Sequence, residues 1–204
     1  MPTITELMQK APVIPVLVID RIEDARPIAE ALVAGGLPLL EVTLRTPAAL
    51  DAIRAMKAVP GAIVGAGTVL NKDGLEHAID AGADFIVSPG LTKKLGKAAI
   101  ASGMPFLPGI SNAADIMLGL DLGLDRFKFF PAETSGGRKA LAAFAAVFRD
   151  VRFCPTGGIT AETAPGWLSD PHVLCVGGSW LVGSGPIDPA AIEARARDAA
   201  GFAR

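Results

Sequence analysis

The chain has 204 residues, of which 50% are apolar and 5% aromatic, and its 19 basic and 21 acidic side chains give a net charge of −2. This length favours one domain over residues 1–204, with a core large enough to fold without disulfide or metal cross-links. The apolar composition excludes a disordered chain, and the lack of a basic excess argues against nucleic-acid binding. No apolar run approaches the ~20 residues of a membrane helix, so we expect no membrane contact.

The cysteines and the first residues predict a cytoplasmic protein. Cys154 and Cys175 lie far apart and form no C-x-x-C pair, which favours a reducing compartment over a disulfide framework. Residues 1–10 contain Glu6 and lack the basic start of a signal peptide. His77 and His172 have no carboxylates beside them at a predicted strand end, so no metal site is expected.

Short apolar runs alternate with alanine-rich helical patterns along the whole chain. The predicted strands begin near Val13, Pro38, Ala62, Asp84, Pro105, Arg126, Val151 and His172. Their starts are 21 to 25 residues apart, which is enough for one strand, a turn and one helix. Residues suited to cap these helices are Thr46, Asn71, Thr92, Asn112 and Thr160. Several helices run into glycines that favour a helix end, namely Gly35-Gly36, Gly82, Gly103 and Gly123.

Eight such units predict an α/β fold of the (β/α)₈ TIM-barrel type. Strands that are apolar on both faces indicate a parallel sheet covered by helices, and about 200 residues is the small end for a barrel. An open doubly wound sheet usually has a glycine-rich turn after its first strand, and residues 18–21 contain none. Residues 1–12 are predicted to form a short extra helix that closes the bottom of the barrel.

Polar residues near strand ends indicate where chemistry takes place, because active sites of such barrels lie at the carboxyl ends of the strands. In the second strand Glu41, Thr43 and Arg45 share one face, since side chains alternate between faces. The opposite face is apolar and suits the helix layer, which directs Glu41 and Arg45 into the barrel or its mouth. A structural ion pair of Glu41 with Arg45 or a neighbour is the alternative interpretation.

Lys128 is the one lysine of eight that lies inside a predicted strand. Alternation places Phe127 and Phe129 on one face, and Arg126, Lys128 and Phe130 on the other. Burial disfavours the ammonium form, and a neutral amine is what attack on a carbonyl requires. We therefore predict a nucleophile, against the alternatives of a lysine that reaches the rim or pairs with Glu41.

Glycines and hydroxyl groups follow three other strands. Gly67 and Thr68 end the third strand, where glycine permits close approach of a ligand and Thr68 is also suited to cap a helix. The seventh strand ends in Thr156-Gly157-Gly158, and Ser179 follows the eighth. Phosphate sites of these barrels often lie in these last two loops, so we predict one here, with ordinary turns as the alternative.

Together these groups indicate a class I aldolase acting on a phosphorylated 2-keto acid. Lys128 would form an imine with the ketone, Arg45 would pair with the carboxylate, and Glu41 would move protons. Two other classes fit the barrel and the phosphate loops: an isomerase or synthase that uses no imine, and a non-catalytic sugar-phosphate binding module. Lys128 together with Glu41 argues against both.

The sequence resembles the family of 2-keto-3-deoxy-6-phosphogluconate (KDPG) aldolases, including relatives that cleave 4-hydroxy-2-oxoglutarate. The resemblance covers nearly the whole chain. It is carried by residues 40–46 (LEVTLRT), 64–71 (VGAGTVLN), 88–92 (SPGLT), 108–111 (PGIS), 127–133 (FKFFPAE), 152–159 (RFCPTGGI) and 177–181 (GGSWL).

This resemblance implies roles for the individual residues. Lys128 matches the Schiff-base lysine, Glu41 the proton-shuttling acid/base, and Phe130 a residue near the imine. Arg45 and Thr68 match residues that hold the pyruvate carboxylate. The residues matching positions around the substrate hydroxyls and phosphate are Thr156, Gly157, Gly158 and Ser179.

The resemblance also implies a biological setting. It points to a cofactor-free homotrimer of the Entner–Doudoroff pathway that cleaves KDPG to pyruvate and glyceraldehyde 3-phosphate. Cleavage of 4-hydroxy-2-oxoglutarate to pyruvate and glyoxylate is a second implied activity. An aldolase for the C4 epimer, of the galactonate series, is the alternative.

Overall fold

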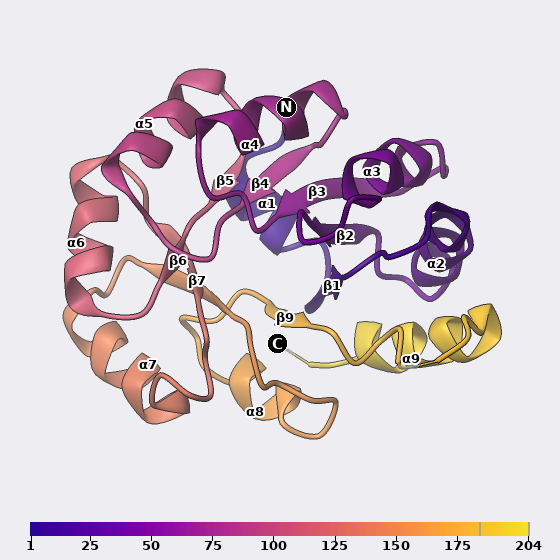
Figure 1. The fold of residues 1–204 in the computed structure, drawn as a ribbon. Helices are drawn as coiled ribbons and strands as arrows, with labels where there is room; N and C mark the ends of the chain where they lie inside the picture. Colours follow the sequence, from indigo (N-terminus) through magenta and orange to yellow (C-terminus); the bar gives the residue numbers. More distant parts are fainter. Residues whose placement is uncertain (184, 204) are drawn as a thin grey trace.

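The computed structural model describes residues 1–183 and 185–203, which form a ring of parallel strands surrounded by helices (Figure 1). The strands are β1 (Val13–Leu17), β2 (Leu39–Thr43), β3 (Ile63–Gly67), β4 (Phe85–Val87), β5 (Phe106–Leu107), β6 (Gly109–Ile110), β7 (Arg126–Phe129), β8 (Arg152–Pro155) and β9 (Val176–Gly178). The helices are α1 (Ile4–Met8), α2 (Ile22–Ala34), α3 (Ala49–Lys57), α4 (Lys72–Asp80), α5 (Lys93–Ser102), α6 (Ala113–Asp121), α7 (Gly137–Val147), α8 (Ala164–Leu168) and α9 (Pro189–Ala200).

The strands close into the predicted TIM barrel. Hydrogen bonds join β5-β4-β3-β2-β1-β9 in one sheet and β6-β7-β8 in another. The break between β5 and β6 falls at Pro108, which has no N–H to donate, so both pieces belong to the strand predicted near Pro105. On the other side the ring is closed by two single bridges: Phe153 of β8 pairs with Val173, and Thr156, just after β8, pairs with Gly177 of β9.

The predicted start of the last strand near His172 is wrong. The carboxylate of Asp170 accepts a hydrogen bond from the His172 amide at 2.9 Å, and residues 171–172 form a turn. Val173 then makes a single bridge, and regular pairing begins only at Val176. A local side-chain bond thus competes with the strand at this point.

Three of the predicted helix caps are confirmed. Their side chains accept backbone N–H groups of the first helical turn at 2.8 to 3.2 Å, and they are Asn71, Thr92 and Asn112. Thr46 is not a side-chain cap, because its hydroxyl donates to the carbonyl of Ile19 and α3 begins only at Ala49. The hydroxyl of Thr160 accepts the backbone N–H of Thr163 at 3.4 Å, as a capping side chain does, but α8 begins only at Ala164 and its N-cap is Thr163.

Helix α1 is the predicted extra helix, and it closes one end of the barrel (Figure 1). Thr3 and Glu6 form a reciprocal capping box that starts this short helix. Arg126, at the beginning of β7, donates to the hydroxyl of Thr5 and ties α1 to the amino-terminal ends of the strands. Leu7 and Met8 of α1 are fully buried in an apolar cluster with Ile14, Leu39, Phe85, Val87, Leu107, Cys154 and Cys175.

A second, larger apolar layer lies between the strands and the outer helices. Phe129 shows how the alternation of a strand serves it: its ring meets Phe144 of α7 at 5.9 Å and Trp167 of α8 at 6.3 Å between centroids. Within the described ranges, no helix is long and apolar enough to cross a bilayer.

Candidate active site

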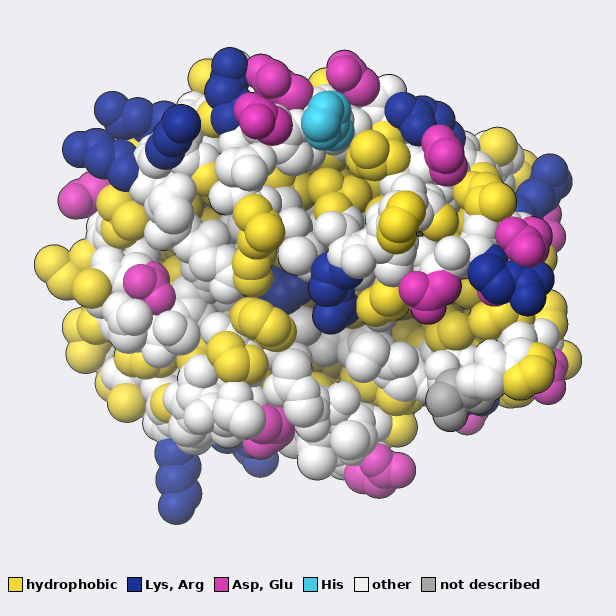
Figure 2. Space-filling view, in the orientation of Figure 1, with side chains coloured by type: hydrophobic (Ala, Val, Ile, Leu, Met, Phe, Trp, Pro, Cys, Tyr) yellow, Lys and Arg dark blue, Asp and Glu magenta, His cyan; other side chains and the backbone are white. Residues whose placement is uncertain are grey.

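The carboxyl ends of the strands surround a cavity of about 230 Å³. Figure 2 faces this end of the barrel and shows basic side chains, in dark blue, inside the hollow at its centre. The cavity is lined by Val16, Glu41, Thr43, Arg45, Thr68, Pro89, Lys128, Phe130 and Thr156. Most of the predicted site residues therefore lie in one cavity, whereas Val16, Thr43 and Pro89 were not predicted as site residues.

Lys128 points from β7 into this cavity, as the strand pattern predicts. Its neighbours Phe127 and Phe129 are fully buried in the outer apolar layer, so Lys128 and Phe130 face the other way. Lys128 is only 6% exposed, and its ammonium nitrogen lies 5.5 Å from the centroid of the Phe130 ring. This distance allows a cation–π contact when the amine is charged.

Glu41 forms a buried ion pair with Lys128. The Nζ atom of Lys128 lies 2.8 Å from Oε1 and 3.2 Å from Oε2 of Glu41. Glu41 is only 3% exposed. The partner of Glu41 is therefore Lys128 and not Arg45. Because a buried ion pair is weak evidence for stability, the pairing does not by itself explain these two residues. The short distance also allows a proton to pass between them.

Gly67 makes room for the carboxylate of Glu41. It lies on β3 beside β2, and a Cβ atom added to it would stand 2.3 Å from Oε1 of Glu41. Gly177 of β9 does the same for Thr156, the residue after β8, where an added Cβ would stand 2.2 Å from the hydroxyl oxygen. The sequence predicts that glycine at the end of the third strand admits a ligand; the structure shows that Gly67 admits the neighbouring Glu41 side chain.

Arg45 and Thr68 lie on the rim of the same cavity. The Nε atom of Arg45 donates to the hydroxyl of Thr43 at 3.2 Å, and that hydroxyl donates to the carbonyl of Leu17 at 2.8 Å. Thr68 has a φ of +58°, a left-handed conformation that is uncommon outside glycine. The alternative role of Thr68 as a helix cap is wrong, because Asn71 caps α4.

Gly157, Gly158 and Ser179 lie outside the lining of the cavity. They follow β8 and β9 at the same end of the barrel, and Ser179 is exposed. Gly157 and Gly158 have φ values of +103° and +81°, which favour glycine. A Cβ at Gly158 would also stand 2.8 Å from the side chain of Glu133.

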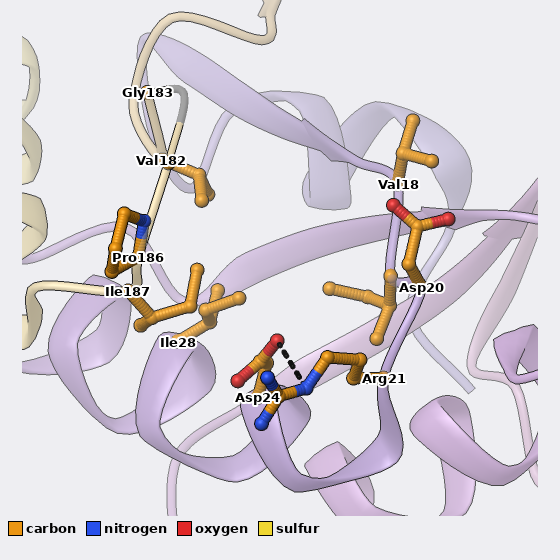
Figure 3. Close-up of a pocket in the computed structure, with 11 residues that line it drawn as sticks. Val18, Asp20, Arg21, Asp24, Ile28, Val182, Gly183, Pro186 and Ile187 are labelled. Carbon is orange, nitrogen blue, oxygen red and sulfur yellow. Dashed lines mark ion pairs between the residues drawn. The ribbon is translucent and has the colours of Figure 1, made fainter.

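A larger cavity of about 770 Å³ lies between the loop after β1 and the loop after β9 (Figure 3). Its charged residues include Arg21 and Asp24, which pair with each other at 3.7 Å. None of the predicted site residues lines it. Size alone does not mark the reactive site, and the buried lysine and carboxylate belong to the smaller cavity.

Comparison with known proteins relates this chain to aldolases. A family model described as KDPG and KHG aldolase matches residues 4–195. The chain is 64% identical to the 2-dehydro-3-deoxy-phosphogluconate aldolase of Zymomonas mobilis over 201 residues, covering 98% of this chain and 97% of that protein. It is 56% identical to the KHG/KDPG aldolase of Escherichia coli over 177 residues, covering 86% and 83%.

A solved structure shares the architecture. The KDPG aldolase of Legionella pneumophila was crystallised with pyruvate captured at low pH as a covalent carbinolamine intermediate. It matches the present structure with a TM-score of 0.95 and 41% identity, covering 98% of this chain and 99% of that one.

Proposed function

The chain belongs to the family of KDPG and KHG aldolases, and we propose that Lys128 and Glu41 carry out its aldol cleavage. It is a lyase that splits 2-dehydro-3-deoxy-6-phosphogluconate into pyruvate and glyceraldehyde 3-phosphate in the Entner–Doudoroff pathway. Cleavage of 4-hydroxy-2-oxoglutarate to pyruvate and glyoxylate is its second activity, since the E. coli relative carries both substrates in its name. The observation that carries this assignment is the buried Lys128–Glu41 pair in the cavity.

The first stage forms an imine. The ammonium of Lys128 passes one proton to Glu41, whose Oε1 lies 2.8 Å away, and the neutral amine attacks the C2 carbonyl carbon of the substrate. An amine proton moves to the former carbonyl oxygen, which gives a carbinolamine. Glu41 then protonates that hydroxyl, which leaves as water, and Lys128 holds the substrate as a protonated imine.

The second stage breaks the carbon–carbon bond. Glu41, again a carboxylate, accepts the proton of the C4 hydroxyl, and the C3–C4 electron pair moves toward the imine nitrogen. Glyceraldehyde 3-phosphate leaves as the aldehyde and an enamine of pyruvate remains. Glu41 returns the proton to C3, and water hydrolyses the resulting imine. The protonated imine serves as the electron sink, so the proposed chemistry needs no cofactor or metal.

The residues around this pair hold the pyruvate half of the substrate. The guanidinium of Arg45 pairs with its carboxylate, and the hydroxyl of Thr68, on the same rim, donates to that group. The ring of Phe130, 5.5 Å from Nζ, packs against the imine and limits the access of water.

The loops after β8 and β9 hold the other half. The hydroxyl of Thr156 lies in the cavity wall and reaches the substrate hydroxyls. The backbone amides of Gly157 and Gly158, with the exposed hydroxyl of Ser179, bind the phosphate at the mouth. The gluconate series is the proposed substrate, in line with the Zymomonas relative.

We propose further that residues 1–204 act as one domain, that three copies assemble, and that the enzyme works in the cytoplasm. A phosphorylated sugar acid does not cross membranes freely, which places the reaction where its substrate is made. Light scattering on a sizing column tests the assembly: a trimer has three times the 20.9 kDa of the chain, and the mass of a single chain contradicts it.

Trapping with borohydride tests the mechanism. Protein is mixed with pyruvate and borohydride, and peptide mass spectrometry locates the reduced pyruvyl group, which we expect on Lys128. Protein treated without pyruvate is one control, and Lys128→Met is the other, in which the adduct disappears. Folded protein with no adduct, or with the adduct on another lysine, would show that Lys128 does not form the imine.

A further inference from the structure

Thr43 connects the fold of the barrel to Arg45. It ends β2, lines the cavity, and is 2% exposed. We propose that Thr43 is a positioning residue, whose hydroxyl orients the guanidinium of Arg45 for the substrate carboxylate. This inference rests on the proposed role of Arg45.

The direction of the two hydrogen bonds is fixed by chemistry. The hydroxyl of Thr43 has a single proton, which it donates to the carbonyl of Leu17 on β1 at 2.8 Å. A lone pair of the same oxygen accepts Nε–H of Arg45 at 3.2 Å. Hydrogen bonds in such a chain polarise one another. The carbonyl of Leu17 on β1 therefore sets the position of the charged side chain of Arg45, just after β2.

The backbone on either side of Thr43 is also held. The amide of Leu44 donates to the carbonyl of Gly67 at 2.8 Å, and the amide of Arg45 donates to the carbonyl of Thr43 at 2.8 Å. These bonds fix the backbone of Arg45, although the residue is exposed. They do not fix the conformation of its long side chain.

The contact with Thr43 occupies one of the three nitrogen positions of the guanidinium. Among the described residues, Thr43 is the one hydrogen-bond partner of the Arg45 side chain. Because Nε is engaged, the two terminal nitrogens remain for the substrate, side by side, as bidentate recognition of a carboxylate requires. Holding the side chain before binding also lowers the entropy lost when the substrate arrives.

The test compares Thr43→Val with Thr43→Ser. Valine keeps the shape but removes the hydroxyl, and serine restores it. We expect Thr43→Val to raise the KM for KDPG about tenfold, in line with the loss of a hydrogen bond to a charged group, while kcat changes less than twofold. The pyruvate concentration for half-maximal borohydride trapping should rise in parallel. Thr43→Ser should restore both values to within about twofold, since the same hydrogen bonds re-form.

Thr46→Val is the matched control. The hydroxyl of Thr46 also donates to a backbone carbonyl in the segment after β1, that of Ile19, but it lies outside the cavity lining. Its loss should lower stability with no change in KM. Equal shifts of KM in Thr43→Val and Thr46→Val, or a loss of kcat with KM unchanged, would overturn the proposal. If Thr43→Val does not fold, Thr43→Ala replaces it, with the same expected rise of KM.

The variant Arg45→Ala separates the proposed role of Thr43 from the proposed role of Arg45 in binding the substrate carboxylate. We expect Arg45→Ala to raise the half-saturating pyruvate concentration, and Thr43→Val to add nothing further in the Arg45→Ala protein. If Arg45→Ala has its effect and Thr43→Val has none in the native background, the carboxylate role of Arg45 stands and the role of Thr43 fails. If Arg45→Ala has no effect, both fail.

Discussion

The two ends of the barrel are made by the same strands and serve opposite purposes. At the closed end, α1 places Leu7 and Met8 into an apolar cluster. At the open end, the side chains that line the cavity include charged and hydroxyl groups, such as Lys128, Glu41 and Thr43. Strand β2 contributes to both, from Leu39 in the apolar cluster to Glu41 in the cavity. Whether a residue stabilises the fold or takes part in the chemistry thus depends on its position along the strand, and less on which strand it belongs to.

Removing the nucleophile gives the largest effect expected at the open end. In Lys128→Met, kcat/KM for KDPG should fall by more than about 10⁴-fold, comparable to the loss of a covalent nucleophile in other enzymes. Steady-state assay of pyruvate release measures it, with circular dichroism to confirm folding. Unchanged turnover would remove the imine mechanism.

Glu41→Gln tests the proton transfers. The amide keeps the shape of the side chain but accepts no proton, so kcat should fall by about 10² to 10⁴-fold, the usual range for general acid–base catalysis. Both the rate of borohydride trapping and the rate of cleavage should decrease. Inhibition by inorganic phosphate should persist, because Glu41 is not one of the residues proposed to bind the phosphate. Normal cleavage with weakened phosphate inhibition would contradict the assignment.

Leu7→Ala probes the closed end. Leu7 is fully buried, and truncation of such a leucine typically costs about 3 to 5 kcal/mol of the free energy of unfolding. Urea unfolding measures this loss. The kcat at a temperature where the variant is folded should stay within twofold of the native value. A fall in kcat without a loss of stability would show that the two ends are coupled.

Two glycines on β3 compare the ends within one strand. A Cβ on Gly67 would stand 2.3 Å from Oε1 of Glu41, and one on Gly65 would stand 2.4 Å from the ring of Phe85. Gly67→Ala should displace the carboxylate and lower kcat about 10²-fold, as small misplacements do. Gly65→Ala should cost about 1 to 3 kcal/mol through overpacking and leave kcat of the folded enzyme unchanged. Equal kcat values for the two variants would refute the distinction.

The capping box of α1 gives the smallest effect. Thr3→Ala should cost about 1 kcal/mol, the usual loss for an N-cap. In the native protein, hydrogen bonds first from the Thr3 amide and then from its hydroxyl lower the pKa of Glu6. A carboxyl with a lowered folded pKa stabilises the protein above its unfolded pKa, and this contribution disappears as the pH falls through the folded value. Thr3→Ala removes the bond from the Thr3 hydroxyl to the Glu6 carboxylate, which depends on pH, and the bond from the Glu6 amide to that hydroxyl, which does not. The stability difference between the two proteins should therefore shrink but not vanish in unfolding curves from pH 7 to pH 3, and a constant difference would exclude a contribution from the carboxylate.

Much of the barrel could be predicted because hydrophobic periodicity along the chain is a local signal. The misplaced start of the last strand and the failed cap at Thr46 depend instead on side-chain hydrogen bonds. For the last strand, the hydrogen bond from the His172 amide to Asp170 holds residues 171–172 in a turn. The strand therefore begins later than the apolar pattern predicts. The hydroxyl of Thr46 instead donates to the carbonyl of Ile19, in the loop between β1 and α2. The two residues are far apart in the sequence, so a local pattern cannot predict this contact.

The part of the cavity that could be predicted is the part set by the alternation of side chains along a single strand. Lys128 and Glu41 stand out because charged residues rarely occur in buried strands. Thr43 shares the face of Glu41, but threonine is common in strands and its position alone indicates no contact with Arg45. The fit of Gly67 against Glu41 requires the register of two strands, which composition does not contain.

The position of α1 has a practical consequence for attaching the protein to a support. Met1 is 93% exposed and precedes a helix that lies at the end of the barrel opposite the cavity. A tether at Met1 would therefore leave the substrate entrance facing the solution. Catalyst immobilised in this way should keep its KM, whereas random coupling through lysines also modifies residues such as Lys93 and Lys94, the first two residues of α5, at the catalytic end.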